Sequence, residues 1–259
     1  MPTIESNGET LFYTQTGDGP AVVLLHAVGA RAALWSETAA HFGDDRRIYA
    51  FDLRGHGDSS LNGSLEVTDM TADLVGALEA LGVDRFHLVG VSLGAGIAVH
   101  LAASVGSAVE SLSVAGIGLV PDQVLEDEVY GIREAAHYLA EEDFAEQIGE
   151  ALLMPEAPAA GIEGIRAGVA SLGKRNYLAG LEAMLATDLT GVAPNVTAPS
   201  LVLHGELDEL VSEEQARALA DALPEGTLQI LENTGHVAHL DNPNALGEAI
   251  AKFLGSHAS

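Results

Sequence analysis

The chain has 259 residues, a formal charge of −27 from 38 acidic and 11 basic residues, and no cysteine. Its length fits one large α/β domain or two small ones, and a 47% hydrophobic content suffices for a continuous core. The charge disfavours nucleic acid and anionic membranes as partners, and the lack of cysteine leaves oxygen or nitrogen as the only protein nucleophiles.

The first residues, Met1 to Glu5, lack the basic and apolar stretches of a secretory signal. No run of about 18 apolar residues occurs that could span a membrane. We therefore expect a cytoplasmic protein with no membrane partner. A salt-rich habitat and a basic partner remain open as explanations of the charge, beside simple solvation of the surface. A homo-oligomer is also compatible with the sequence.

Short apolar runs recur along the chain, as is typical of buried strands. A first strand is predicted at 10–16, ended by the turn signal Gly17-Asp18-Gly19-Pro20. Runs without alternation suit strands that are buried on both faces of a sheet. Such runs lie at 21–25, 48–51, 86–89, 109–115, 201–203 and 228–231.

Between most of these runs, apolar residues recur at helical spacing. Leu74, Leu78 and Leu81 do so in the stretch 70–81, and a similar stretch lies at 215–223. Strands that alternate with helices predict an α/β fold with a doubly wound, mostly parallel sheet.

The alternation stops after Gly118 and resumes near Pro199. Within this interval, residues such as Ile165, Val169 and Leu172 have helical spacing, which indicates several short helices. We therefore expect a helical cap inserted in the second half of the fold. The expected division is a core of residues 1–118 and 190–259 and a cap of residues 119–189.

The segment Gly90-Val91-Ser92-Leu93-Gly94 has the pattern Gly-x-Ser-x-Gly. It follows the apolar run at 86–89 and opens an alanine-rich helical stretch at 97–103, which is the strand-turn-helix setting that the pattern requires. Its glycines allow a turn too tight for side chains, and the strain exposes the serine hydroxyl above the sheet. Ser92 is therefore the predicted nucleophile.

A serine hydroxyl needs a base to activate it and a carboxylate to orient that base. His236 stands in the loop after the last predicted strand, at the sheet edge where ligands bind in α/β folds. We predict His236 as the base, with His239 as the alternative.

The turn after the strand at 201–203 supplies the carboxylate. Asp208 is the predicted orienting residue, and Glu206 and Glu209 are the alternatives. The chain order Ser92, Asp208, His236 is the order expected on this architecture.

Two backbone N–H groups are expected to bind the oxyanion that forms when the serine attacks. One belongs to Leu93, and the other to Val28 in the loop after the strand at 21–25. Losing one such donor typically costs about 100-fold in rate.

These residues together make the chain resemble α/β-hydrolase-fold enzymes over nearly its whole length. The segment Asp52 to Ser59 resembles a further family signature, a loop that supports the site, so His56 is not expected to be the base. At His26-Ala27-Val28-Gly29 many members carry His-Gly, but a small residue still fits. The segments 25–29, 51–57 and 177–189, with Leu34-Trp35, look most similar to the 3-oxoadipate enol-lactonase group.

The resemblance implies a serine hydrolase that cleaves a small carboxylic ester or lactone, an enol-lactone included, through an acyl-enzyme. It implies no cofactor and no metal. Carbon-carbon bond hydrolases and cofactor-free perhydrolases or haloperoxidases share the same signatures and remain alternatives. The non-enzyme alternative is a ligand receptor on the same fold. Ser92 disfavours the members with an aspartate nucleophile, such as haloalkane dehalogenases.

The inserted segment interrupts the sheet between Ser92 and Asp208, so we expect it to cover the catalytic edge as a lid. A small, largely apolar pocket would favour short neutral esters over long lipids. The predicted substrate-contacting residues are Trp35, Tyr130, Tyr138 and Tyr177, and further inward-facing candidates are Phe144, Met154 and Met184. An acidic substrate would need a cationic anchor, and Arg133, Arg166 and Arg175 are the only arginines of the insert.

Overall fold

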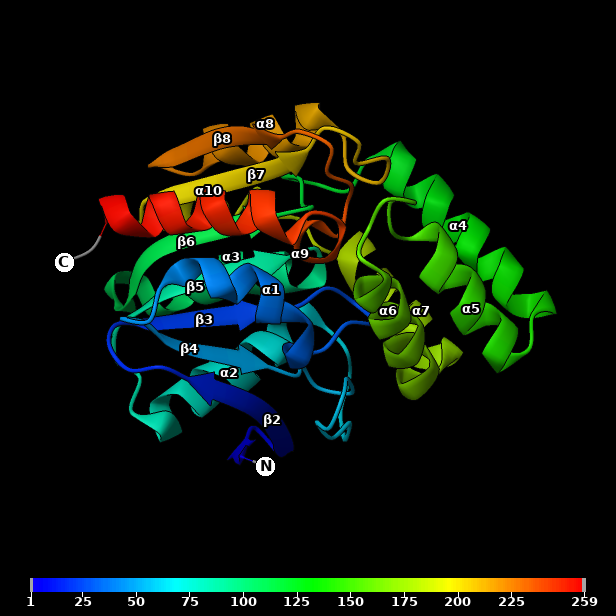
Figure 1. The fold of residues 1–259 in the computed structure, drawn as a ribbon, viewed down its shortest axis with the longest axis horizontal. Coiled ribbons are helices and arrows are strands. Elements are labelled where there is room, and N and C mark those ends of the chain that lie inside the picture. Colours follow the sequence, from blue (N-terminus) through cyan, green and yellow to red (C-terminus); the bar gives the residue numbers. More distant parts are fainter. Residues whose placement is uncertain (1, 258–259) are drawn as a thin grey trace.

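Eight strands form one sheet in the computed structural model, which describes residues 2–257 (Figure 1). Their order across the sheet is β1-β2-β4-β3-β5-β6-β7-β8. β2 runs antiparallel to both of its neighbours, and the other pairs are parallel. This arrangement confirms the expected mostly parallel sheet. The strands span Thr3–Ser6 (β1), Glu9–Thr16 (β2), Ala21–Leu25 (β3), Arg47–Phe51 (β4), Phe86–Val91 (β5), Val109–Ala115 (β6), Ser200–Gly205 (β7) and Gly226–Leu231 (β8).

Helices cover both faces of the sheet (Figure 1). α2, α3 and α8 lie on one face, and α1 and α10 pack together on the other. Among the described residues, no helix is both long and apolar enough to cross a membrane. The helices of the core span Ser36–Ala39 (α1), Val67–Leu81 (α2), Leu93–Val105 (α3), Glu213–Ala222 (α8), Ala238–Asp241 (α9) and Pro243–Ser256 (α10).

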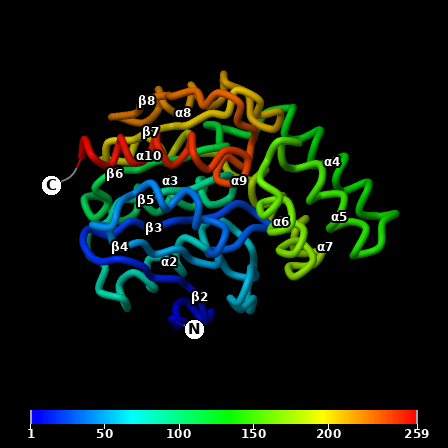
Figure 2. Tube along the Cα trace, in the orientation of Figure 1, coloured from blue at the N-terminus to red at the C-terminus, as the bar shows by residue number. Residues whose placement is uncertain are grey.

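Four further helices form a layer beyond the carboxyl ends of the parallel strands (Figures 1 and 2). α5 packs on α6, α4 packs on α7, and α7 contacts α3 below. All four lie inside the segment 119–189, which is the predicted cap. They span Gln123–Tyr138 (α4), Glu141–Ala151 (α5), Ala159–Leu172 (α6) and Lys174–Leu185 (α7).

The two edges of the sheet differ from the sequence-based expectation. β1 was not predicted, because Thr3–Ser6 is mostly polar; it pairs with β2 at the edge. The expectation that β8 is buried on both faces was wrong, since only Leu231 is buried, two residues of the strand are partly buried and three are exposed, among them Ile230 at 36%. An edge strand has one neighbour, and the flanking helices leave part of β8 uncovered.

The central strands form the core and position the turn that contains Ser92. All five residues of β3 and all six of β5 are buried. Their parallel register pairs Leu25 with Gly90, so the two strands end side by side. The loop after β3 and the turn into α3 therefore emerge at the same edge of the sheet, beneath the cap.

Two glycines let this turn fit against its surroundings. A Cβ on Gly90 would lie 2.3 Å from the carbonyl oxygen of Gly94, and a Cβ on Gly94 would lie 2.3 Å from the carbonyl oxygen of Leu25 and 2.7 Å from that of His26. These obstacles are backbone atoms, which cannot rotate away as a side chain can. The start of α3 can therefore touch the loop after β3 only because residue 94 has no side chain.

We expect Gly94→Ala to lower the free energy of unfolding by roughly 1–3 kcal/mol, the usual cost of overpacking, and to displace the nucleophile. Urea unfolding measures the first effect and turnover the second. Gly255→Ala is the matched control, since a Cβ there meets nothing within 4 Å in α10. Equal stability of the Gly94→Ala and Gly255→Ala proteins would contradict the close approach.

Candidate active site

Ser92 occupies the turn between β5 and α3 in a strained backbone conformation. Its φ of 55° and ψ of −117° lie where residues with a side chain are rarely found. The Ser92 N–H donates to the carbonyl of Ala115 at 2.8 Å, which ties the turn to the end of β6. The Ser92 residue is only 1% exposed.

Three side chains from distant parts of the chain meet at this turn. The Ser92 hydroxyl lies 2.8 Å from Nε2 of His236, which stands in the loop after β8. His236 Nδ1 lies 3.1 Å from both carboxylate oxygens of Asp208, in the turn after β7. The structure therefore brings the predicted nucleophile, base and orienting carboxylate into one hydrogen-bonded chain.

The surroundings of Asp208 favour its charged form. Burial alone would raise the pKa of this carboxyl, but the charge and hydrogen bond of His236 lower it. The backbone N–H groups of Leu210 and Val211 also donate to Asp208 Oδ1, at 2.9 and 3.0 Å. The net effect holds the pKa of Asp208 below its ordinary value, so the residue is a carboxylate at neutral pH.

Opposing effects act on the pKa of His236. Burial lowers its pKa, whereas the charge and hydrogen bond of Asp208, together with the charge of Asp241, raise it. The net pKa is raised above the ordinary value of 6.5. The imidazolium that forms when a base takes a proton is therefore stabilised at this position.

The alternative residues are not part of this hydrogen-bonded chain. His239 stacks on Trp35, with ring centroids 4.5 Å apart, and burial followed by the nearby His26 lowers its pKa to about 3. Glu206 accepts a hydrogen bond from the backbone N–H of Asn233 at 3.1 Å. Glu209 lines the cavity beside His236, but Asp208 makes the hydrogen bonds to its ring.

The two expected oxyanion donors lie close to the nucleophile. Leu93 is the first residue of α3, where an N–H has no partner within the helix. Val28 lines a small chamber together with Ser92. The close approach at Gly94 brings the segment with Val28 to the start of α3.

The loop after β3 is held by the neighbouring loop that begins at Asp52. His26 accepts a hydrogen bond from the Leu53 N–H through Nε2 at 3.0 Å, so its Nδ1 donates to the Ala27 carbonyl at 2.7 Å. Asp52 Oδ1 accepts from the Ala32 N–H at 2.6 Å. The His56 ring packs edge-on against His26, 5.0 Å away, and burial lowers the pKa of His56 to about 3. This loop therefore supports the site structurally.

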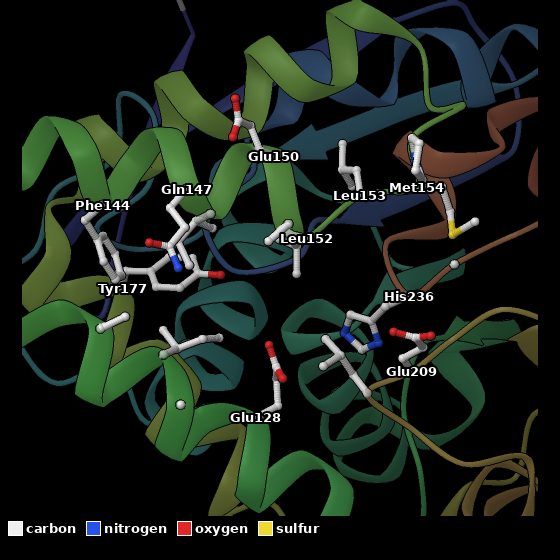
Figure 3. Close-up of a pocket in the computed structure, with 18 of the residues that line it drawn as sticks. Glu128, Phe144, Gln147, Glu150, Leu152, Leu153, Met154, Tyr177, Glu209 and His236 are labelled. Carbon is white, nitrogen blue, oxygen red and sulfur yellow. The ribbon is translucent and has the colours of Figure 1, made fainter. Parts of the chain in front are cut away.

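Two connected spaces open above Ser92. The small chamber, of about 20 Å³, is lined by Ser92, His236, Val28 and the cap residue Met184, whose sulfur lies 3.5 Å from the Ser92 hydroxyl oxygen. A larger cavity of about 600 Å³ lies under α4 and α5 and also reaches His236 (Figure 3). Tyr177 lines both spaces, as do Glu128, Ile132, Leu152 and Leu210.

Three of the predicted substrate-contacting residues line neither space. Tyr130 is 63% and Tyr138 85% exposed, because the inner face of α4 is formed by other residues, such as Leu125 and Val129. Trp35 is buried beneath the loop after β3 against His239. The assignment of these three to the pocket was wrong. Tyr177, Phe144, Met154 and Met184 do line the spaces as expected.

A family model described as "alpha/beta hydrolase fold" matches residues 20–243. The chain belongs to this family. An enol-lactonase from Burkholderia xenovorans LB400 is a close structural match, with a TM-score of 0.85, 23% identity and coverage of 98% of this chain and 100% of the other.

Curated relatives of this α/β-hydrolase align along nearly the full chain. A pimeloyl-[acyl-carrier protein] methyl ester esterase of Vibrio atlanticus is 28% identical over 257 residues, covering 95% of this chain and 98% of the relative. The 3-oxoadipate enol-lactonase 2 of Acinetobacter baylyi is 22% identical over 259 residues, covering 97% and 96%. The latter agrees with the subfamily resemblance inferred from the sequence.

Asp241 is a residue of this hydrolase site that the sequence did not reveal. Its carboxylate accepts hydrogen bonds from the N–H of Met154 in the cap at 2.7 Å and from the N–H of Val237 at 3.0 Å. Burial raises its pKa, an effect that these hydrogen bonds and the charge of His236 reduce. In the sequence it is one of many acidic residues, and only its position five residues after His236 sets it apart.

We expect an NMR titration of His236 to give a pKa above 6.5 and to give a lower pKa in the Asp241→Asn protein. The variant removes a negative charge that favours the imidazolium, so half-protonation moves to lower pH. Glu206→Gln is the control, because Glu206 is not among the charges that act on His236. A pKa that is unchanged or higher in Asp241→Asn would show that the Asp241 charge does not act on the base.

Proposed function

We propose that this α/β-hydrolase cleaves small carboxylic esters or lactones through an acyl-enzyme on Ser92. The observation that carries the proposal is the hydrogen-bonded chain from the Ser92 hydroxyl through His236 to Asp208, located at the floor of a cavity. A serine hydroxyl with a base in hydrogen-bond reach and an oriented base is the arrangement required for acyl transfer.

In the first half of the reaction, Ser92 Oγ attacks the substrate carbonyl carbon while His236 Nε2 takes the hydroxyl proton. The negative oxygen that results is bound by the N–H groups of Leu93 and Val28. Asp208 stabilises the imidazolium without taking its proton. The intermediate collapses as the carbon–oxygen bond to the leaving group breaks, and His236 donates the proton to that oxygen.

In the second half, a water molecule attacks the acyl carbon and His236 takes one of its protons. The second tetrahedral intermediate expels Ser92 Oγ, which regains its proton from His236. The acid product leaves and the enzyme returns to its starting state. The raised pKa of His236 supports this cycle, because the residue must hold a proton between the two proton transfers of each half.

The named activities of the relatives support an ester-type bond as the target. One relative is named as a methyl ester esterase and another as an enol-lactonase, and both names describe cleavage of a carbonyl–oxygen bond. The shape of the site also limits the size of the substrate. Since the chamber directly above Ser92 holds only about 20 Å³, one side of the scissile bond must be small, while the other can occupy the larger cavity.

A fluorophosphonate probe is expected to label the protein at Ser92, and Ser92→Ala should abolish labelling and lower kcat by about 10⁶-fold. His236→Ala should be about as severe, whereas Asp208→Asn should retain more activity, with a loss of about 10⁴-fold. Ser104→Ala, which changes a serine near the other end of α3, is the control and should label normally. Mass spectrometry of the labelled peptide decides the assignment, and a label on another serine would refute it.

We expect chain length to affect nitrophenyl and methyl esters differently. From acetate to palmitate, kcat/KM for nitrophenyl esters should fall steeply, by about 100-fold or more, because both sides of the bond become bulky and the carbonyl is misplaced. Methyl esters should tolerate longer acyl groups, since their methoxy group is the small side of the bond that the chamber requires. Amides of the same acids should react much more slowly because their leaving group is poorer. A maximum at the long-chain end of the nitrophenyl series would contradict the size limit.

A further inference from the structure

The larger cavity is negatively charged. Three glutamates line it, Glu128 from α4, Glu150 from α5 and Glu209 from the turn after β7. Among the described residues that line either space, none is a lysine or an arginine. The cavity therefore has carboxylates with no basic side chain to neutralise them.

The arginines that could anchor an acidic substrate lie outside this lining. Arg133 pairs with Glu182 at 2.9 Å, and Arg166 pairs with Glu163 on the surface of α6. Arg175 is exposed at the start of α7. None of the three arginines is therefore placed in the cavity to anchor an acidic substrate.

An unpartnered hydroxyl lies beside this negative charge. Tyr177 is fully buried at 0% exposure, and its hydroxyl oxygen has no hydrogen-bond partner among the described residues. A buried polar group without a partner costs about 1–3 kcal/mol, so it is seldom kept without a use. Burial, and to a smaller extent the charge of Glu128, raises the pKa of Tyr177, so the hydroxyl stays protonated.

Figure 3 shows how these groups are aimed. The Tyr177 hydroxyl and the Glu128 carboxylate both point into the cavity, and His236 lies across it. Both residues also line the small chamber with Ser92. The two residues therefore border both the small chamber and the larger cavity.

We propose that Glu128 and Tyr177 form a subsite for a protonated amine on the group of the substrate that occupies the larger cavity. The inference rests on the proposed ester hydrolysis and names the substrate class that the site selects. An ammonium N–H can donate to the Glu128 carboxylate and another to the Tyr177 oxygen, which supplies the missing partner of the hydroxyl. A carboxylate in the same position would face three glutamates and no compensating cation.

The test uses two sets of matched esters that differ only in charge. One set comprises acetate esters of para-(aminomethyl)benzyl, para-ethylbenzyl and para-carboxybenzyl alcohol, and the other comprises methyl esters of the correspondingly substituted phenylacetic acids. We expect kcat/KM in at least one set to be about tenfold higher for the amine than for the neutral ester. The acid should have a lower kcat/KM than the neutral ester. The preference should shrink in about 1 M salt, where the Debye length is about 3 Å.

Variants test which residues cause the preference for the amine over the neutral ester. Glu128→Gln should reduce the ratio of kcat/KM for the amine to kcat/KM for the neutral ester to within about threefold. Tyr177→Phe should reduce this ratio in part. It should not lower the melting temperature, since the Tyr177 hydroxyl has no hydrogen-bond partner to lose. Glu126→Gln is the matched control, because it removes the same charge from an exposed position of α4 outside the cavity and should keep the wild-type ratio.

A binding experiment separates this proposal from the proposed reaction. Calorimetric titration of the wild-type protein with benzylammonium and with benzoate should show binding of the amine alone, and Glu128→Gln should weaken it about tenfold. If neutral esters are not cleaved but this binding is found, the proposed reaction fails and the subsite stands. If the wild-type protein neither prefers nor binds the amine, or if Glu128→Gln keeps the wild-type preference, the subsite is refuted.

Discussion

The close contact between the end of β3 and the start of α3 is the constraint on which the rest of the site depends. It requires residue 94 to lack a side chain, and it brings the segment that contains Val28 to the start of α3, beside Ser92. The nucleophile turn is strained, with a φ of 55° at Ser92, and a strained turn persists only when its neighbours hold it. The buried strands β3, β5 and β6 supply that hold through register and through the hydrogen bond from the Ser92 N–H to Ala115.

Four histidines near the site are buried, and their pKa values differ. His26, His56 and His239 have pKa values lowered to about 4, 3 and 3, so they are neutral and serve as packing and hydrogen-bonding groups. His236 is as deeply enclosed, but Asp208 and Asp241 act on it and its pKa is raised. The residue type alone therefore does not mark the base. Neighbouring carboxylates raise the pKa of His236 and so distinguish it from the other three imidazoles.

The sequence predicted the sheet and the three hydrogen-bonded side chains because each has a local signal. Strands buried on both faces read as apolar runs, and Ser92, Asp208 and His236 each follow such a run at a defined edge. Their meeting is thus a consequence of the topology of the sheet.

The cap residues lack such signals. Tyr130 and Tyr138 lie on α4 with Glu128, and which of them faces the cavity depends on how α4 packs against α7, a contact that no local pattern encodes. Trp35 was misassigned for a related reason, because its partner His239 is about 200 residues away in the chain. No sequence pattern marks Asp241, and only the two backbone N–H groups that donate to its carboxylate identify it as part of the site.

The Asp241 carboxylate links the cap to the loop that contains His236. One of its oxygens holds the backbone at Met154, between α5 and α6, and the other holds the backbone next to His236. Lifting the cap at this point would leave a buried carboxylate oxygen without its donor, at a cost of roughly 1–3 kcal/mol or more for a charged group. The same carboxylate therefore ties the backbone of the cap at Met154 to the backbone at Val237, so that a displacement of the cap at this junction would also disturb the residue next to the imidazole of His236.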